Sequence, residues 1–195
     1  MDLTTFIQAA GYAGVTGIVF AESGLLVGFF LPGDSLLFTA GLLASQGFFN
    51  IWWMTALTAA AAVIGDNVGY SFGHKWGRRL FEKKDGRFFK RENLVKAEAF
   101  YEEYGAKTIV LARFMPFIRT FAPIVAGIGK MDYRTFFRYN LIGGLLWAVG
   151  MNLAGFWLGR TIPGVDRYLL PIIIVIVIIS VIAPAREYLA KKRSK

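Results

Sequence analysis

Two arginines and two carboxylates lie in or beside segments that are otherwise apolar. Arg113 and Arg119 belong to the stretch ARFMPFIRTFAPIVAG, and Glu22 and Asp34 border a second apolar run. An arginine keeps its charge at any accessible pH, and at the centre of a bilayer it costs at least about 2.5 kcal/mol. Its planar guanidinium suits phosphate or carboxylate partners. Arg113 and Arg119 therefore predict an anion-binding site, with two alternatives: ion pairs to Glu22 or Asp34, or side chains that reach the membrane interface.

Glu22 and Asp34 are the acidic half of this pattern. A carboxylate removed from water can hold a proton at neutral pH, so both residues are candidates for proton coupling. Asp34 could instead cap a short helix that begins near Ser35, and Glu22 could end a helix at the membrane interface. Two carboxylates and two arginines in apolar surroundings match the composition of a proton-coupled anion site.

The composition indicates an integral membrane protein built from one domain. The 195 residues are 55% hydrophobic and 16% aromatic, and their mean hydropathy is +0.49. The net charge of +9 comes from clusters that flank apolar segments, which favours positively charged cytoplasmic loops over a nucleic-acid surface. The absence of cysteine excludes disulfides and thiolate chemistry. The N-terminus lacks a basic region, so we expect no cleaved signal peptide.

The apolar segments predict an all-α polytopic membrane protein spanning residues 1–195. The expected elements are an N-terminal helix (3–21), a first broken segment (23–44), a transmembrane helix (49–73), a basic cytoplasmic segment (75–104) that contains an amphipathic helix (91–104), a second broken segment (107–128), two transmembrane helices (139–159 and 168–185) and a basic cytoplasmic tail (186–195).

Prolines and glycine interrupt both broken segments. Pro32 and Gly33 divide the first, and Pro116 and Pro123 divide the second, because proline removes a backbone donor and glycine frees the chain to turn. If 107–128 enters and leaves the membrane on one side, nearly all basic clusters lie on the cytoplasmic side. We therefore expect two re-entrant hairpins of opposite orientation, which form an inverted-repeat core around a central site.

The stretch GDNVGYSFGHKWG allows two interpretations. Gly65, Gly69, Gly73 and Gly77 recur every four residues, which places them on one helix face and predicts close helix packing. The same stretch contains GYSFG, a pattern found around serine nucleophiles. No strand is expected before Ser71, so an intramembrane serine hydrolase is only an alternative. Asp66 and Asn67 are polar inside the span, where they could form helix–helix hydrogen bonds or join the site.

These motifs resemble the DedA family, which comprises the bacterial VTT-domain membrane proteins. The resemblance covers roughly residues 10–160. It rests on Glu22, on FLPGDS, on GDNVGYSFGHKWG, and on RFMPFIR followed by PIVAG. It implies two membrane-embedded hairpins around a central site, and a role in proton-dependent membrane homeostasis and in recycling undecaprenyl phosphate. The family's important acidic and basic positions correspond to Glu22, Asp34, Arg113 and Arg119.

The sequence therefore predicts a transporter of an anionic polyprenyl-phosphate lipid in the bacterial inner membrane, with a cytoplasmic C-terminus. Arg113 and Arg119 would bind the phosphate, and Glu22 and Asp34 would exchange protons. Membrane lipids and protons are the expected partners, and the chain could also form a homo-oligomer. No enzymatic activity, cofactor, metal or nucleic acid is expected. A phospholipid scramblase and a non-transporting scaffold with structural salt bridges are the alternatives.

Overall fold

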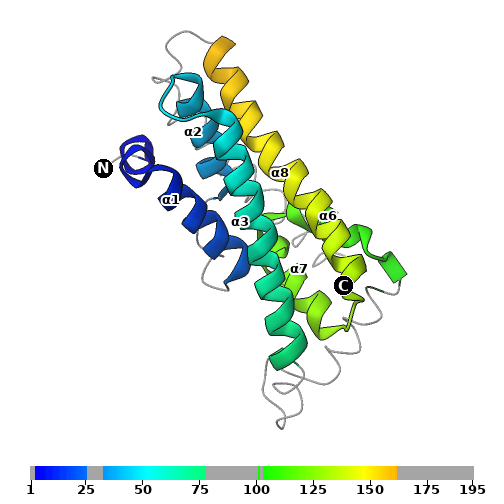
Figure 1. The fold of residues 1–195 in the computed structure, drawn as a ribbon. Helices are drawn as coiled ribbons and strands as arrows, with labels where there is room; N and C mark the ends of the chain where they lie inside the picture. The colour runs from blue at the N-terminus through cyan, green and yellow to red at the C-terminus, as the bar shows by residue number, and fades with distance from the viewer. Residues whose placement is uncertain (1–2, 26–32, 78–100, 102, 162–195) are drawn as a thin grey trace, which may run out of the picture.

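The chain folds into a bundle of α-helices (Figure 1). A computed structural model describes residues 3–25, 33–77, 101 and 103–161. Within these ranges every regular element is helical and none is a strand, which confirms the all-α prediction. The predicted transmembrane helix 168–185, the tail 186–195 and most of the basic segment 75–104 lie outside the described residues.

The helices keep to the apolar segments but differ from the prediction at their ends. They are α1 (Leu3–Gly24), α2 (Gly33–Ser45), α3 (Ile51–Phe72), the π-helical turn η2 (Gly73–Gly77), α6 (Lys107–Arg113), α7 (Pro116–Ile128) and α8 (Tyr133–Thr161). α1 continues through Glu22 instead of ending before it. A kink at Gly11, where φ is 60°, divides this helix, and glycine adopts that conformation at little cost.

Side-chain caps fix where the two longest uninterrupted helices begin. The Asn50 side chain accepts hydrogen bonds from the backbone N–H groups of Trp52 and Trp53, at 3.0 and 3.2 Å, and so starts α3. Asp132 starts α8 in the same way, because its carboxylate accepts the Thr135 N–H at 2.9 Å. Hydrogen bonds from the Thr135 backbone and hydroxyl lower the pKa of this exposed carboxyl.

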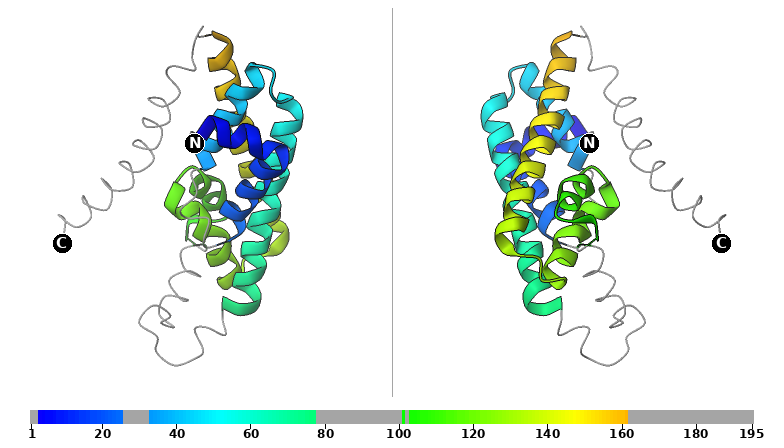
Figure 2. Two further views of the ribbon diagram at one scale, coloured as in Figure 1. Left: turned by 90° about the vertical axis from the view of Figure 1, so that its left-hand side faces the viewer. Right: turned by 90° about the vertical axis from the view of Figure 1, so that its right-hand side faces the viewer.

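α3 and α8 run antiparallel and contact each other along the centre of the bundle (Figure 1). α2 lies beside their upper half, and the α6–α7 pair lies beside their lower half (Figures 1 and 2). α2 packs closely on α8 through glycines: a Cβ at Gly41 would overlap the Asn152 carbonyl, and a Cβ at Gly155 would overlap the Phe38 carbonyl. These contacts place the middle and end of α2 on the C-terminal half of α8.

The glycines that recur every four residues bring two different helices close to α3. A Cβ at Gly65 would overlap backbone atoms of α1, and a Cβ at Gly73 would overlap the carbonyl of Ile124 in α7. Gly77 also faces α7, whereas a Cβ at Gly69 would make ordinary contact there. α1 and α7 are therefore both held near the buried face of α3.

The second broken segment is interrupted at one place. α6 ends at Arg113, and α7 begins at Pro116, which stands at the first helical position that proline favours. Pro123 lies inside α7, so the expected break there is wrong. This proline removes one backbone hydrogen bond, but its ring packs toward Gly69 of α3, where no side chain opposes it. In the first segment Gly33 opens α2, and Pro32 lies outside the described residues.

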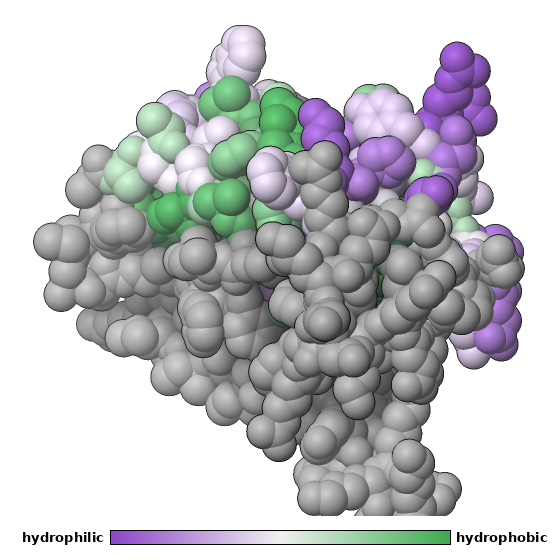
Figure 3. Space-filling view, turned by 90° about the horizontal axis from the view of Figure 1, so that it is seen from below, coloured by the Kyte–Doolittle hydropathy of each residue, from purple (hydrophilic) through white to green (hydrophobic). Residues whose placement is uncertain are grey.

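The outer faces of α3 and α8 expose large apolar side chains. Among the described helices, α8 alone is long and apolar enough to cross a membrane by length and composition. The exposed side chains along its middle are Leu141, Ile142, Leu145 and Leu146, and those of α3 include Leu57, Ile64 and Val68. Figure 3 views the lower end of the molecule, where hydrophobic side chains adjoin hydrophilic ones on the described surface.

Candidate functional site

Arg119 joins three helices at the centre of the bundle. From the first turns of α7 its guanidinium forms an ion pair with Glu22, near the end of α1. A second nitrogen, Nη1, donates to the Oδ1 of Asp34, in the first turn of α2, at 2.9 Å. The Arg119 side chain is 10% exposed and that of Glu22 2%, whereas that of Asp34 is 21% exposed. Three of the four charged residues singled out in the sequence therefore form one contact group.

Gly33 allows Glu22 to reach this position. The Glu22 Oε1 accepts the Gly33 backbone N–H at 3.1 Å, so the carboxylate lies against the N-terminus of α2. A Cβ at Gly33 would overlap the carboxylate. The other carboxylate oxygen, Oε2, is buried and has no hydrogen-bond partner in the described structure. This oxygen is a free acceptor position inside the site.

Trp147 of α8 connects the two arginines. Its indole Nε1 donates to the Asp34 Oδ1 at 2.7 Å, and its ring centroid lies 4.7 Å from the Arg119 Cζ. The Arg113 Cζ lies 5.9 Å from the same centroid. Both guanidiniums are within the range of cation–π attraction, so the Trp147 ring stabilises two buried cations.

We expect Trp147→Phe to slow the function of this site by at least about tenfold, because a hydrogen bond to a charged group contributes about 1.5–3 kcal/mol. The ring beneath Arg119 would remain while the donor to Asp34 is lost. Trp147→Leu should cost more, since it also removes the aromatic ring. The measurement is the initial rate, in reconstituted protein, of the activity that the sequence predicts, which is transport of a lipid phosphate. Trp157→Phe, at a 63% exposed position on the same helix, is the matched control, and a full rate in Trp147→Phe would contradict this role.

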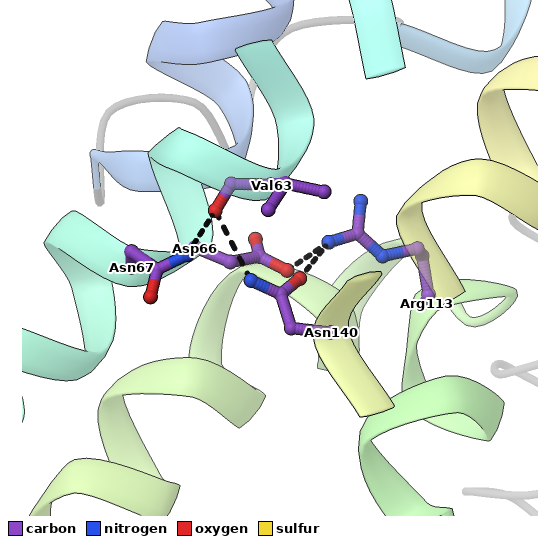
Figure 4. A network of polar contacts seen from close by, with 5 residues as sticks. All are labelled: Val63, Asp66, Asn67, Arg113 and Asn140. Atoms are coloured by element: carbon purple, nitrogen blue, oxygen red, sulfur yellow. Dashed lines mark hydrogen bonds and ion pairs between the residues drawn. The ribbon is translucent and has the colours of Figure 1, made fainter. Parts of the chain in front are cut away.

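Arg113 belongs to a second network, which also contains Asp66 and Asn140 (Figure 4). Its Nη2 pairs with Asp66 of α3 and donates to the Oδ1 of Asn140 in α8 at 2.7 Å. Arg113 is 4% exposed, and Asn140 is fully buried. Gly143 and Gly144 face the Arg113 side chain, and a Cβ at either position would lie within 4 Å of it. The Arg113 side chain therefore lies along the glycine-lined face of α8.

Sequence reasoning selected the four charged residues but not all of their partners. Glu22, Asp34 and Arg119 meet, whereas Arg113 lies in the separate network with Asp66. Trp147 and Asn140 were not predicted. Asn140 had a usable signal, because a buried amide in an apolar helix requires a hydrogen-bond partner. Ser71, the alternative nucleophile, lies on the exposed face of α3 and outside both networks.

The relatives of this chain agree with the resemblance. The VTT domain family matches residues 31–157. Protein DedA of Escherichia coli (strain K12) is 46% identical over 185 residues, which is 94% of this chain and 84% of the relative. An uncharacterized membrane protein of Mycobacterium leprae (strain TN) is 43% identical over 91% of this chain and 79% of its own.

A more distant relative is inner membrane protein YghB of Escherichia coli (strain K12). It is 33% identical over 83% of this chain and 74% of its own. No solved structure matches the chain significantly. The coverage and identity of these relatives, together with the domain match, show that the chain belongs to the VTT domain family of membrane proteins, alongside protein DedA.

Proposed function

We propose that this protein transports an anionic polyprenyl-phosphate lipid, undecaprenyl phosphate, across the bacterial inner membrane in a proton-coupled cycle. The observation that carries the proposal is the pair of buried arginines, each held by carboxylates and both beside Trp147. The lipid chain would stay in the bilayer while the phosphate passes through the polar centre. The protein acts in this proposal as a transporter and not as an enzyme.

The exposed side chains support a position across the membrane. Exposed aromatic residues gather at both ends of the α3–α8 pair, and such residues favour the membrane interface. They are Phe48, Trp52, Trp53 and Trp157 at one end, and Phe72, Trp76, Tyr133 and Phe137 at the other. About 20 helical residues separate the two groups along α3, which corresponds to about 30 Å, the thickness of the hydrocarbon core.

The charge distribution supports an orientation. Four basic residues lie near the lower end of α3 and the start of α8: Lys75, Lys130, Arg134 and Arg138. Arg160 lies at the opposite end of α8. By the positive-inside rule the lower end is cytoplasmic. The proposal includes two re-entrant hairpins, with α2 and α7 as their second halves, and a cytoplasmic C-terminus.

The helix ends suit an anion. α2 and α7 begin at Gly33 and Pro116, and the charged residues Asp34 and Arg119 lie in their first turns. A helix N-terminus carries a partial positive charge and unpaired N–H groups, which favour phosphate. In the described state the Glu22 carboxylate accepts the N–H at the start of α2. A phosphate would replace carboxylates at this position and on the arginines.

The count of charges supports proton coupling. The two networks hold three carboxylates (Glu22, Asp34 and Asp66) and two guanidiniums, which leaves one excess negative charge among the described residues when every group is ionised. Burying an unbalanced charge is costly. One proton on a carboxylate would neutralise the cluster, and a proton entering with the phosphate would release an arginine from its internal partner.

The decisive test is transport of undecaprenyl phosphate by purified protein in proteoliposomes, with and without an imposed pH gradient. We expect movement that depends on the gradient and that is lost in Arg113→Ala/Arg119→Ala. Movement that is independent of the gradient and extends to bulk phospholipid would instead indicate a scramblase. No movement by folded protein under either condition would reject the proposed substrate.

A scaffold is the second candidate, because both arginines are already paired with carboxylates in the structure. In a scaffold the ion pairs only hold helices together. Exchanging the charges in Asp66→Arg/Arg113→Asp, a pair with no second carboxylate among its described partners, would then preserve function. A transporter would lose its arginine at the required position.

A further inference from the structure

Asp66 is a buried carboxylate to which the proposed cycle assigns no individual role. It lies on α3, is 5% exposed, and pairs with the Nη2 of Arg113. The same nitrogen donates to the Oδ1 of Asn140 at 2.7 Å. Arg113 is itself 4% exposed, so its guanidinium is enclosed by these partners. Because both partners contact Nη2, a phosphate that binds Arg113 through this nitrogen must displace at least one of them.

The two partners of Arg113 differ in how they are held. Asn140 is anchored, because its Nδ2 donates to the Val63 carbonyl at 3.0 Å. Figure 4 shows that the same carbonyl accepts the Nδ2 of Asn67, at 2.7 Å, beside Asp66. Asn140 is also neutral, so it does not repel a phosphate. Asp66 carries the same charge sign as the phosphate and would compete with it for one guanidinium.

We infer that Asp66 is the internal competitor of the substrate phosphate at Arg113, so that binding of the phosphate there requires Asp66 to give up the arginine. This inference rests on the proposed function and adds to it a residue that sets affinity. Asp66 keeps the empty site balanced, and Asn140 remains on Arg113 to orient it. The phosphate and the Asp66 carboxylate occupy Arg113 alternately.

The position of Trp147 gives this competition a role in transport. The indole ring lies 5.9 Å from the Cζ of Arg113 and 4.7 Å from that of Arg119. A phosphate that Asp66 expels from Arg113 would therefore remain within reach of the second arginine. An arginine that is mostly paired with its own carboxylate has a reduced apparent affinity for a ligand. Only the unpaired fraction of the arginine can bind, and the apparent affinity falls in proportion to that fraction. Competition of this kind keeps the lipid from binding too tightly to be released.

Asp66→Asn tests the inference, because asparagine keeps the shape of the side chain and removes its charge. We expect the full-length variant in detergent to bind undecaprenyl phosphate about tenfold more tightly than the wild type. Undecaprenol, which lacks the phosphate, should bind both proteins equally. In proteoliposomes the substrate concentration at half-maximal rate should fall and the maximal rate should fall as well, since release becomes slower.

A structural role would give the opposite result. If Asp66 only positions Arg113, Asp66→Asn would bind the phosphate with unchanged or lower affinity, and either result from folded protein would overturn the inference. The variant leaves a buried arginine without its carboxylate and is expected to be less stable. Addition of undecaprenyl phosphate should therefore raise its unfolding temperature more than that of the wild type.

Asn140→Asp provides the reverse test and keeps Asp66 in place. It adds a second carboxylate beside the Nη2 of Arg113, so competition predicts binding weaker by about tenfold. Unchanged or tighter binding would overturn the inference even if Asp66→Asn failed to fold. A wild-type protein that binds undecaprenyl phosphate and undecaprenol equally would instead reject the proposed function, which separates the two failures.

Discussion

Replacing Arg119 with alanine is expected to abolish transport and to destabilise the folded protein by about 3–5 kcal/mol, the cost of breaking a buried ion pair. Arg119 is the cation shared by Glu22 and Asp34. Without it the two carboxylates would face each other in a buried site, and α1, α2 and α7 would lose the contact that joins them. The measurements are lipid transport in proteoliposomes and thermal unfolding in detergent.

A second variant separates stability from function at Arg119. Glu22→Gln/Arg119→Ala removes one negative charge together with the positive one, so it should recover much of the lost stability. We expect it to remain inactive, because the proposed phosphate site has lost one of its two arginines. Arg119→Lys should retain partial activity, since lysine keeps the charge without the planar fork. Full activity in the double variant would show that Arg119 is a structural residue.

Gly33→Ala is expected to have the second-largest effect. A Cβ at this position would overlap the Glu22 carboxylate, which is 2% exposed and has no room to retreat. The added methyl group must displace either Glu22 or the start of α2, and overpacking of this kind costs about 1–3 kcal/mol. Either movement would separate the Glu22 carboxylate from the Gly33 N–H and disturb its ion pair with Arg119, so transport should be nearly lost.

The matched control for Gly33→Ala is Gly17→Ala in α1. A Cβ at Gly17 would meet no atom within 4 Å, and alanine favours a helix over glycine by about 1 kcal/mol. The control should therefore keep full transport and unfold at the same or a higher temperature. If Gly33→Ala transports lipid as well as this control, the close contact between Glu22 and α2 is not needed for function.

Local sequence features predicted the helices and the charged residues. The apolar segments predicted α1, α2, α3, α7 and α8 as helices, because an apolar run of this length must satisfy its backbone within the segment. Pro116 indicated where α7 begins. The helix break predicted at Pro123 was wrong, since proline can stand at the start of a helix, as Pro116 does, and can also be tolerated inside one. The Pro123 ring packs toward Gly69 of α3, which is 54 positions earlier in the chain.

The partners of the charged residues depended on helix packing. Arg119 and Asp34 are 85 positions apart, and Arg113 and Asp66 are 47 positions apart. Periodicity within one segment contains no information about which face of another segment it will meet. Both arginines were equally good candidates for Glu22 or Asp34 on sequence grounds. α7 packs against α3, and α6 packs against α8. This packing places the arginine of α7 in one network and the arginine of α6 in the other.

The sequence by itself determined that four charges in apolar surroundings must be paired, because an unpaired charge away from water is too costly to keep. It therefore determined the kind of site and the residue types in it. The tertiary structure alone decided that Asn140 and Trp147 belong to the site, that Asp66 pairs with Arg113, and that both guanidiniums lie near one indole ring. The physical reason is that pairing depends on close helix contacts, and the glycines that permit those contacts act only once the helices have packed together.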